Sequence, residues 1–115
     1  MQDCIFCKIA KHELEAEVVY ENDLVIAFKD ANPVTKVHIL IMPKEHIKNF
    51  YELAKHPQQA LIMGAVTEAA AEIADQFNIS EGFRVITNNG RAGGQSVFHL
   101  HFHLIGGQEL GMKLV

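Results

Sequence analysis

The segment 99–105 reads His-Leu-His-Phe-His-Leu-Ile, and its strict alternation of histidines with bulky apolar residues constrains the local structure more than any other part of the chain. Successive side chains of a β-strand point to opposite faces. The alternation therefore predicts a strand with His99, His101 and His103 on one face and apolar residues on the other. A buried imidazole needs a hydrogen-bond partner, a metal or water. We interpret the histidine face as a functional site rather than as a solvated strand surface.

The rest of the chain predicts an antiparallel α+β domain. Runs of β-branched and aromatic residues bounded by turn residues indicate strands, whereas apolar residues at three- and four-residue spacing indicate one long helix that packs on the sheet. Two shorter helical segments are expected, the first with Asp3 as its N-cap. With 115 residues and no repeat or linker, the chain fits one domain, residues 1–115. The expected strands are residues 17–21, 24–28, 37–42, 82–87 and 99–105, and the expected helices are residues 4–10, 49–54 and 57–77.

Charge and hydropathy narrow the choice of partner and compartment. The net charge of −4 argues against a general nucleic-acid binder, which usually carries a basic surface, but it is compatible with a local pocket for one small anion. The start of the chain lacks the basic and apolar regions of a secretory signal, and no apolar run approaches the ~20 residues of a membrane-spanning helix. We expect a cytoplasmic protein with no nucleic-acid or membrane partner. Its two cysteines are then metal ligands or thiols rather than a structural disulfide.

The loop before the histidine segment contains a candidate anion site. Gly93-Gly94-Gln95-Ser96 combines turn-forming glycines, exposed backbone N–H groups, an amide and a hydroxyl, which together suit phosphate oxygens. A histidine row by itself fits a catalytic metal, a nucleophile with its helpers, or a proton relay. The adjoining anion site favours attack on phosphorus by a neutral imidazole, because a phosphorylated imidazole is a good leaving group for a hydrolytic second step.

These residues resemble the histidine triad (HIT) family. The segment 99–105 follows the family pattern His-φ-His-φ-His-φ-φ, with φ apolar, and residues 94–97 precede it as in that family. The ending Gly106-Gly107-Gln108-Glu109-Leu110-Gly111 is most similar to the Hint branch, the histidine triad nucleotide-binding proteins. The resemblance implies a HIT-like fold: a five-stranded antiparallel sheet, one long and one or two short helices, and a homodimer that forms one continuous sheet. Further matches are Ile5-Phe6, Ala27-Phe28-Lys29-Asp30, His38-Ile39-Leu40-Ile41-Met42-Pro43-Lys44, Arg84-Val85 and Asn88.

The resemblance assigns catalytic roles to four residues. His101 resembles the nucleophile that takes the nucleoside monophosphate as a covalent adduct. His103 is similar to the third family histidine, which stabilises the phosphate or helps to move a proton. Ser96 resembles a contact to the phosphate and the leaving group, where it would stabilise developing charge. His38 matches a further family histidine that supports the triad.

The same resemblance implies a nucleotide-binding set around these residues. Asp30 looks like the carboxylate that accepts the ribose hydroxyls, a role that its acceptor-only chemistry fits. Gln95 and Asn88 resemble phosphate-side contacts, Gly94 is expected to act through its backbone, and Val97 completes the loop motif. The positions that resemble the lining of the nucleobase pocket are Ile5, Phe6, Phe28, Ala31 and Leu40.

The implied activity is that of a hydrolase that cleaves purine nucleoside phosphoramidates, such as adenylated amines, and releases AMP through a covalent nucleotidyl-histidine intermediate. That mechanism requires no catalytic metal. One alternative is a dinucleoside polyphosphate hydrolase with the same nucleophile and a polyphosphate leaving group. Another is a nucleotide-binding regulatory protein whose hydrolysis is incidental. In each case the expected ligand is a purine nucleotide such as AMP or an adenosine phosphoramidate.

The Cys-x-x-Cys motif adds a separate hypothesis. In an intracellular chain, Cys4 and Cys7 are a redox pair, half of a zinc site, or buried thiols. A zinc site needs two more ligands, and the best candidates are His46 and His99. Related nucleotidyl transferases and some bacterial histidine triad proteins use this arrangement, and two thiolates with two imidazoles make the closed tetrahedral set of a structural site. We therefore favour a structural zinc, with His99 as a ligand rather than a catalyst.

Overall fold

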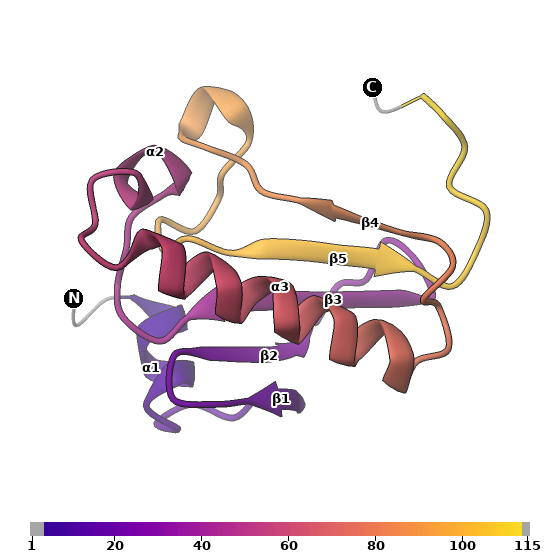
Figure 1. Cartoon of the computed structure of the whole chain (residues 1–115), viewed down its shortest axis with the longest axis horizontal. Coiled ribbons are helices and arrows are strands. Elements are labelled where there is room, and N and C mark those ends of the chain that lie inside the picture. Colours follow the sequence, from indigo (N-terminus) through magenta and orange to yellow (C-terminus); the bar gives the residue numbers. More distant parts are fainter. Residues whose placement is uncertain (1–3, 114–115) are drawn as a thin grey trace.

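The computed structural model describes residues 4–113 and contains a five-stranded antiparallel sheet in the order β1-β2-β3-β5-β4 (Figure 1). Every neighbouring pair of strands is antiparallel. The sheet confirms the α+β fold class expected from the sequence. Because β5 lies between β3 and β4, the histidine segment approaches the middle of the sheet. The strands are β1 (Val18–Glu21), β2 (Val25–Lys29), β3 (Val37–Pro43), β4 (Phe83–Ile86) and β5 (Phe102–Gly106).

Helices cover the two faces of the sheet unequally. The long helix α3 (Gln59–Gln76) lies across one face, whereas the short helix α1 (Ile5–Ala10) packs on the other, near β2 (Figure 1). The alternation of β2 separates the two cores: Val25 and Ala27 pack in the core that contains α3, and Ile26 and Phe28 pack in the core that contains α1. The remaining helices are α2 (Phe50–Leu53) and a single 3₁₀ turn at Arg91–Gly93.

Several boundaries differ from the expectations, most of them by one or two residues. Asp3 lies outside the described residues, and Cys4 serves as the N-cap of α1, since its sulfur accepts the N–H of Cys7 at 3.2 Å. The helix expected from Pro57 begins at Gln59. Apart from these shifts, and the start of β5, the expected elements are present. Among the described residues, none of the helices has the length and apolar character needed to cross a membrane.

The histidine segment enters the sheet later than its alternation indicates. The strand begins at Phe102 and not at His99, because β3 ends at Pro43, which has no N–H to donate to a ladder. The preceding residues remain extended along the same path, and Leu100 donates its N–H to the carbonyl of Ile47 at 2.6 Å. The expected separation of faces holds: Leu100, Phe102 and Leu104 belong to the core beneath α3.

Candidate active site and metal centre

A cavity of about 620 Å³ opens beside the histidine segment, on the face that α1 covers. Its volume suits a nucleotide, since ligand pockets generally span roughly 300–1,000 Å³. Phe6 and Phe28 form an apolar wall with their rings edge to face at 5.6 Å. We call it the nucleotide cavity, after the ligand that the sequence leads us to expect. Ten of its lining residues are among those expected to bind that ligand: Ile5, Phe6, Phe28, Asp30, Ala31, Leu40, Ser96, Val97, His101 and His103.

His101 is held with one ring nitrogen engaged and the other available. Its Nδ1 donates to the backbone carbonyl of His99 at 2.7 Å, which leaves the lone pair on Nε2. Thr87 fixes the same residue from the other side by donating its hydroxyl to the His101 carbonyl at 2.7 Å. Burial lowers the pKa of His101 below its ordinary value, so the ring is neutral near pH 7. A buried neutral imidazole with a free Nε2 has the chemistry of a nucleophile.

His103 carries the opposite arrangement of protons. The N–H of Val34 donates to Nδ1 of His38 at 3.1 Å, which places the proton of His38 on Nε2. That Nε2 donates in turn to Nδ1 of His103 at 2.9 Å. His103 therefore keeps its own proton on Nε2, a ring atom that has no hydrogen-bond partner among the described residues. His101 and His103 thus present a lone pair on Nε2 of one ring and an N–H donor on Nε2 of the other.

Asp30 completes this group at the edge of the cavity. Its Oδ2 lies 3.4 Å from Nε2 of His38, and its Oδ1 accepts the N–H of Asn32 at 2.8 Å. The ligand atoms of Asp30, His38 and His103 lie within 4.8 Å of one another, a spacing that also suits a metal. The hydrogen bond from Val34 argues against that use, because it keeps a proton on the Nε2 atom that would have to bind the metal.

The loop before the histidine segment is held by its own hydrogen bonds. The N–H groups of Gly93, Gly94 and Gln95 all donate to carbonyls within the loop at 3.0 Å. This corrects the expectation that these N–H groups are exposed to an anion. Among residues 4–113, the N–H groups of Ser96 and Val97 have no acceptor, and both residues line the nucleotide cavity. The backbone donors available to a phosphate therefore lie two and three residues after Gly94.

Gln95 occupies the centre of that loop. Its side-chain oxygen accepts the N–H of Gly90 at 2.8 Å, and its side-chain nitrogen donates to the carbonyls of Lys48 and Val97 at 2.8 and 3.0 Å. The residue is 4% exposed. A side chain with these three bonds braces the loop, and the contact with a phosphate that the resemblance implies for Gln95 stays a prediction.

Gly94 and Asn88, for which the resemblance implies contacts with the nucleotide, lie beside the cavity and not in its wall. Gly94 adopts a φ of +90°, a conformation that favours glycine. A Cβ atom at that position would lie 4.0 Å from the side chain of Asn88, so this asparagine faces the loop. Neither residue lines the nucleotide cavity, and neither does His38, which acts on it through His103.

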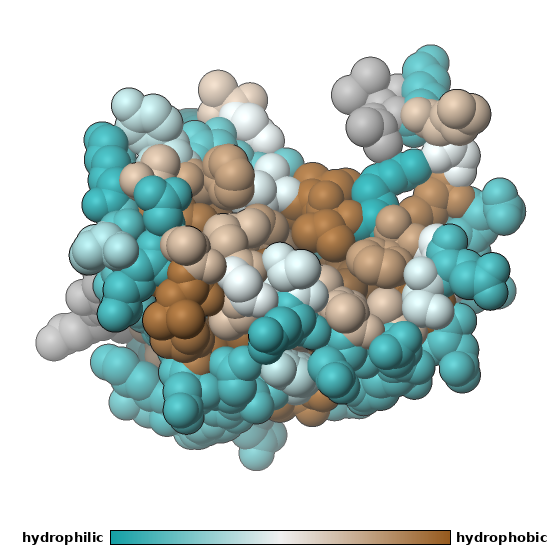
Figure 2. Space-filling view, viewed as in Figure 1, coloured by the Kyte–Doolittle hydropathy of each residue, from teal (hydrophilic) through white to brown (hydrophobic). Residues whose placement is uncertain are grey.

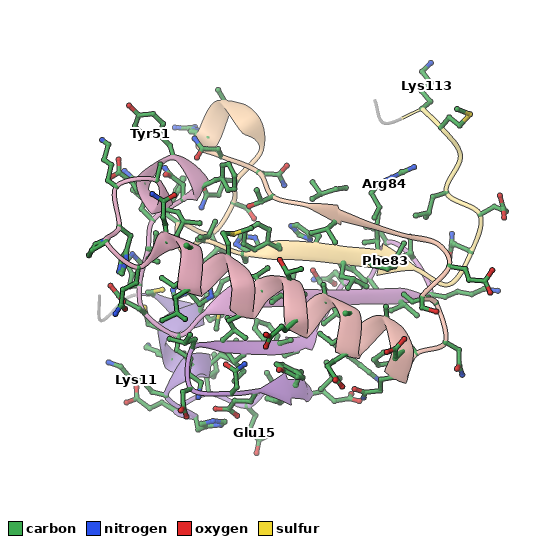
Figure 3. All side chains as sticks on the ribbon, viewed as in Figure 1. Lys11, Glu15, Tyr51, Phe83, Arg84 and Lys113 are labelled. Carbon is green, nitrogen blue, oxygen red and sulfur yellow. The ribbon has the colours of Figure 1, made fainter. Side chains whose placement is uncertain are left out.

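Sequence reasoning missed part of the cavity wall and one support of His101. Ile9 lies one turn after Phe6 on the same face of α1, and that spacing was available in the sequence. No sequence signal pointed to Thr87, because its contact with His101 depends on the approach of two distant segments. The other missed lining residues are Leu14, Glu15, Ala16, Glu17, Lys29 and Asn32; Glu15 is labelled at the lower edge of the molecule in Figure 3.

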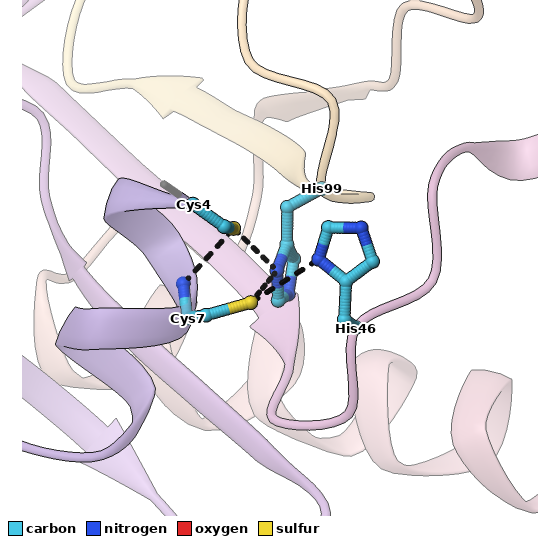
Figure 4. A group of neighbouring side chains, drawn as sticks. All are labelled: Cys4, Cys7, His46 and His99. Atoms are coloured by element: carbon cyan, nitrogen blue, oxygen red, sulfur yellow. Dashed lines mark hydrogen bonds between the residues drawn. The ribbon is translucent and has the colours of Figure 1, made fainter. Parts of the chain in front are cut away.

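Cys4, Cys7, His46 and His99 converge from three distant segments, as Figure 4 shows. Nδ1 of His46 lies 3.1 Å from Sγ of Cys7, and Nδ1 of His99 lies 3.5 Å from the sulfurs of both cysteines. For a tetrahedral zinc with ordinary bond lengths, sulfur and nitrogen ligands are about 3.5 Å apart. The four residues therefore have the chemistry and spacing of a zinc centre.

The surroundings of this cluster also suit a metal. Nε2 of His99 donates to the carbonyl of Pro43 at 2.8 Å, so the lone pair of Nδ1 faces the cysteines. Burial raises the pKa of the Cys7 thiol to about 11, so metal binding at neutral pH must displace its proton. The sequence predicted all four residues, and the structure brings them together, with ligand atoms within 4.8 Å of one another.

Comparison with known proteins identifies the class to which this fold and site belong. Residues 11–110 match the HIT domain, and the chain belongs to the HIT family. It is 43% identical over 114 residues to the purine nucleoside phosphoramidase of Escherichia coli K12, covering 98% of this chain and 94% of that protein. A 14 kDa zinc-binding protein of Zea mays is 43% identical over 108 residues, covering 92% and 83%. A solved HIT family hydrolase from Clostridium thermocellum superposes with a TM-score of 0.94 at 47% identity, covering 100% and 99%.

Proposed function

We propose that the protein hydrolyses purine nucleoside phosphoramidates and releases AMP and an amine. The observation that carries this proposal is the pairing of a free Nε2 lone pair on His101 with a free Nε2–H on His103 at one cavity. Similarity to a purine nucleoside phosphoramidase over nearly the whole chain supports the substrate class. In this reading one HIT domain spans residues 1–115 and works in the cytoplasm on a free nucleotide.

In the first step, Nε2 of His101 attacks the α-phosphorus. The phosphorus–nitrogen bond breaks, and its electron pair stays on the leaving nitrogen, which takes up a proton and departs as an amine. The free Nε2–H of His103 and the backbone N–H groups of Ser96 and Val97 donate to the phosphate oxygens as negative charge develops. The Ser96 hydroxyl can relay the proton from water to the leaving nitrogen.

In the second step, water attacks phosphorus, and the bond between phosphorus and Nε2 breaks with its electron pair returning to neutral His101. The proton that the attacking water releases replaces the one taken up by the amine. Over both steps one water is consumed, since its proton goes to the amine and its hydroxyl goes to phosphorus. In this proposal Asp30 accepts the ribose hydroxyls and the apolar wall around Phe6 and Phe28 receives the purine; the position of all three in the cavity lining supports these roles. None of these steps needs a metal at the phosphate.

We also propose that Cys4, Cys7, His46 and His99 hold a structural zinc. When bound, zinc would cross-link the start of the chain to the histidine segment. His99 then contributes to both sites. Its ring faces the cysteines, and its backbone carbonyl accepts a hydrogen bond from Nδ1 of His101. Phe6 lies between the two sites, with its ring edge to face with that of His101 at 5.0 Å.

A homodimer through the edge strand β4 is the assembly that we propose. Phe83 and Val85 of β4 and Leu61 of α3 are 37%, 43% and 56% exposed, and Figure 2 shows apolar surface on this side of the molecule. Pairing β4 with its copy would continue the sheet and cover these side chains. Light scattering on Val85→Lys should give a monomer. Val18→Lys, on the opposite edge strand, should remain dimeric; a wild-type monomer would refute the dimer.

A substrate panel tests the proposed activity against its alternatives. Release of AMP from adenosine 5′-phosphoramidate should exceed that from diadenosine tetraphosphate. The reverse order would indicate a dinucleoside polyphosphate hydrolase, which uses the same nucleophile. Tight AMP binding with negligible turnover of both compounds would indicate a nucleotide-binding regulatory protein.

A further inference from the structure

A second cavity, of about 580 Å³, adjoins the nucleotide cavity on the side of residues 93–97, which we call the phosphate loop after its proposed ligand. The two cavities share Ile5, Ser96 and Val97. The second one is otherwise lined by Cys4, His46, Lys48 and Phe98, the last of which is 44% exposed and adds apolar surface. Its volume is large enough for an organic group of amino-acid size.

The position of this second cavity relative to His101 fits a leaving group. His101 and His103 line the nucleotide cavity but not the second one, whereas Ser96 lines both. Displacement at phosphorus proceeds with the attacking and leaving atoms roughly in line. Because Ser96 lines both cavities, a group that leaves on the side away from His101 can pass Ser96 into the second cavity.

Lys48 gives this cavity its charge. Of the lining residues in the part of the chain that the structure describes, it is the one lysine or arginine, and none is an aspartate or glutamate. Its backbone carbonyl accepts a hydrogen bond from Gln95 at 2.8 Å, so the position of Lys48 is fixed relative to Ser96. The residue stands where the phosphate loop meets the segment after β3.

The charge of Lys48 is not neutralised by its neighbours. Lys48 also borders a surface hollow that contains Glu45 and Glu52. Those carboxylates have other partners, because Glu45 lies 2.8 Å from His56 and Glu52 lies 3.6 Å from Lys55. Among residues 4–113, Lys48 forms no ion pair. Its ammonium group is therefore available to a ligand.

We propose that the second cavity receives the leaving amine and that Lys48 selects amines that carry a carboxylate, so that the preferred substrates are nucleoside phosphoramidates of amino acids with a free carboxyl group. This inference rests on the proposed phosphoramidase activity and adds the chemistry of the leaving group. The apolar wall formed by Ile5, Val97 and Phe98 accommodates the side chain of the amino acid. The carboxylate takes no part in bond breaking and leaves unchanged with the amine.

The test compares two substrates that differ only in that carboxyl group. AMP joined through nitrogen to alanine is assayed beside AMP joined to alaninamide, which is neutral at the same position, and kcat/KM is measured for each. An exposed charge pair changes such a ratio by about 2- to 5-fold. We expect wild-type protein to prefer the carboxylate by this factor, Lys48→Gln to lose the preference, and Lys48→Glu to reverse it.

The matched control is Lys55→Gln, which removes the same charge from the neighbouring hollow and should keep the wild-type ratio. An equal ratio for wild type and Lys48→Gln would overturn the inference, as would an equal loss of preference in Lys55→Gln. Wild-type turnover of unsubstituted adenosine 5′-phosphoramidate distinguishes failure of the leaving-group proposal from failure of the proposed phosphoramidase activity. If that compound is hydrolysed but no carboxylate preference exists, the leaving-group assignment fails alone; if it is not hydrolysed, the proposed function fails first.

Discussion

The backbone carbonyl of His99 accepts the Nδ1 proton of His101 at 2.7 Å, and the ring of His99 lies 3.5 Å from the sulfurs of Cys4 and Cys7. One residue therefore links the proposed metal centre to the proposed nucleophile. The ring of a metal ligand is fixed by the metal, and its backbone is fixed with it. Metal binding should consequently affect catalysis although no metal touches the substrate.

Purified protein should contain about one zinc per chain. Cys4→Ser should lower that content and the melting temperature by at least about 4 °C, the shift that roughly 1 kcal/mol produces in a domain of this size. Metal analysis and thermal unfolding measure the two effects, and His12→Ala, which removes an exposed histidine paired with Glu21, should change neither. Near-zero zinc in the wild type, together with unchanged stability of Cys4→Ser, would show that Cys4 and Cys7 are ordinary thiols and not zinc ligands.

His38→Ala should slow turnover by at least about 10-fold, because it removes the Nε2–H that sets the proton position on His103. Binding of AMP should fall much less, since His38 does not line the nucleotide cavity. His56→Ala is the matched control, because His56 binds Glu45 away from the cavity. Equal turnover of His38→Ala and wild type would contradict the proposed placement of protons on His38 and His103.

The pH dependence of activity should follow from the environment of His103. Burial first, then the neighbouring His101 and His38, lowers its pKa below the ordinary 6.5, so the ring stays neutral at pH 7. Protonation at Nδ1 would break the bond from His38, and the acid limb of kcat/KM should lie below pH 6.5. Since the unfolded chain binds this proton more readily, the free energy of unfolding should decrease as the pH falls below 6.5. An acid limb above pH 6.5 would contradict this assignment.

Gln95→Ala should reduce the stability of the nucleotide-free protein by about 1–3 kcal/mol, because it leaves buried partners of the amide without hydrogen bonds. Denaturant unfolding without ligand provides the measurement. A residue that served mainly as a phosphate contact would leave this stability unchanged and would affect only nucleotide affinity. Thr67→Ala, which removes an exposed hydroxyl bonded within α3, is the control and should change stability little.

The sequence was sufficient for the sheet and the long helix, and it named ten residues that line the larger cavity and the four that form the Cys/His cluster. Alternation places the histidines of 99–105 opposite the leucines, and the structure keeps that separation although β5 starts only at Phe102. The register of β3 with β5, which pairs Leu40 with His103, was not readable from either segment. The contact between His38 and His103 depends on that register, and so do the proton positions.

The proposed phosphate loop shows why the type of a residue does not by itself indicate which groups its polar atoms contact. Gly93 and Gln95 are the kinds of residue that bind anions, yet the loop uses their polar groups to hold its own conformation. Local backbone hydrogen bonds of this kind depend on the path of the chain around the left-handed Gly94. The sequence pointed to the loop, whereas only the three-dimensional structure shows which of its N–H groups have no backbone acceptor among the described residues.

Turnover of adenosine 5′-phosphoramidate by His101→Ala tests the central claim most directly. The account predicts no detectable AMP release, because among residues 4–113 no other side chain in the cavity lining presents a free imidazole lone pair in the same position. AMP should still bind measurably, since the purine and ribose contacts remain. A His101→Ala protein that releases AMP at the wild-type rate would contradict the proposed mechanism.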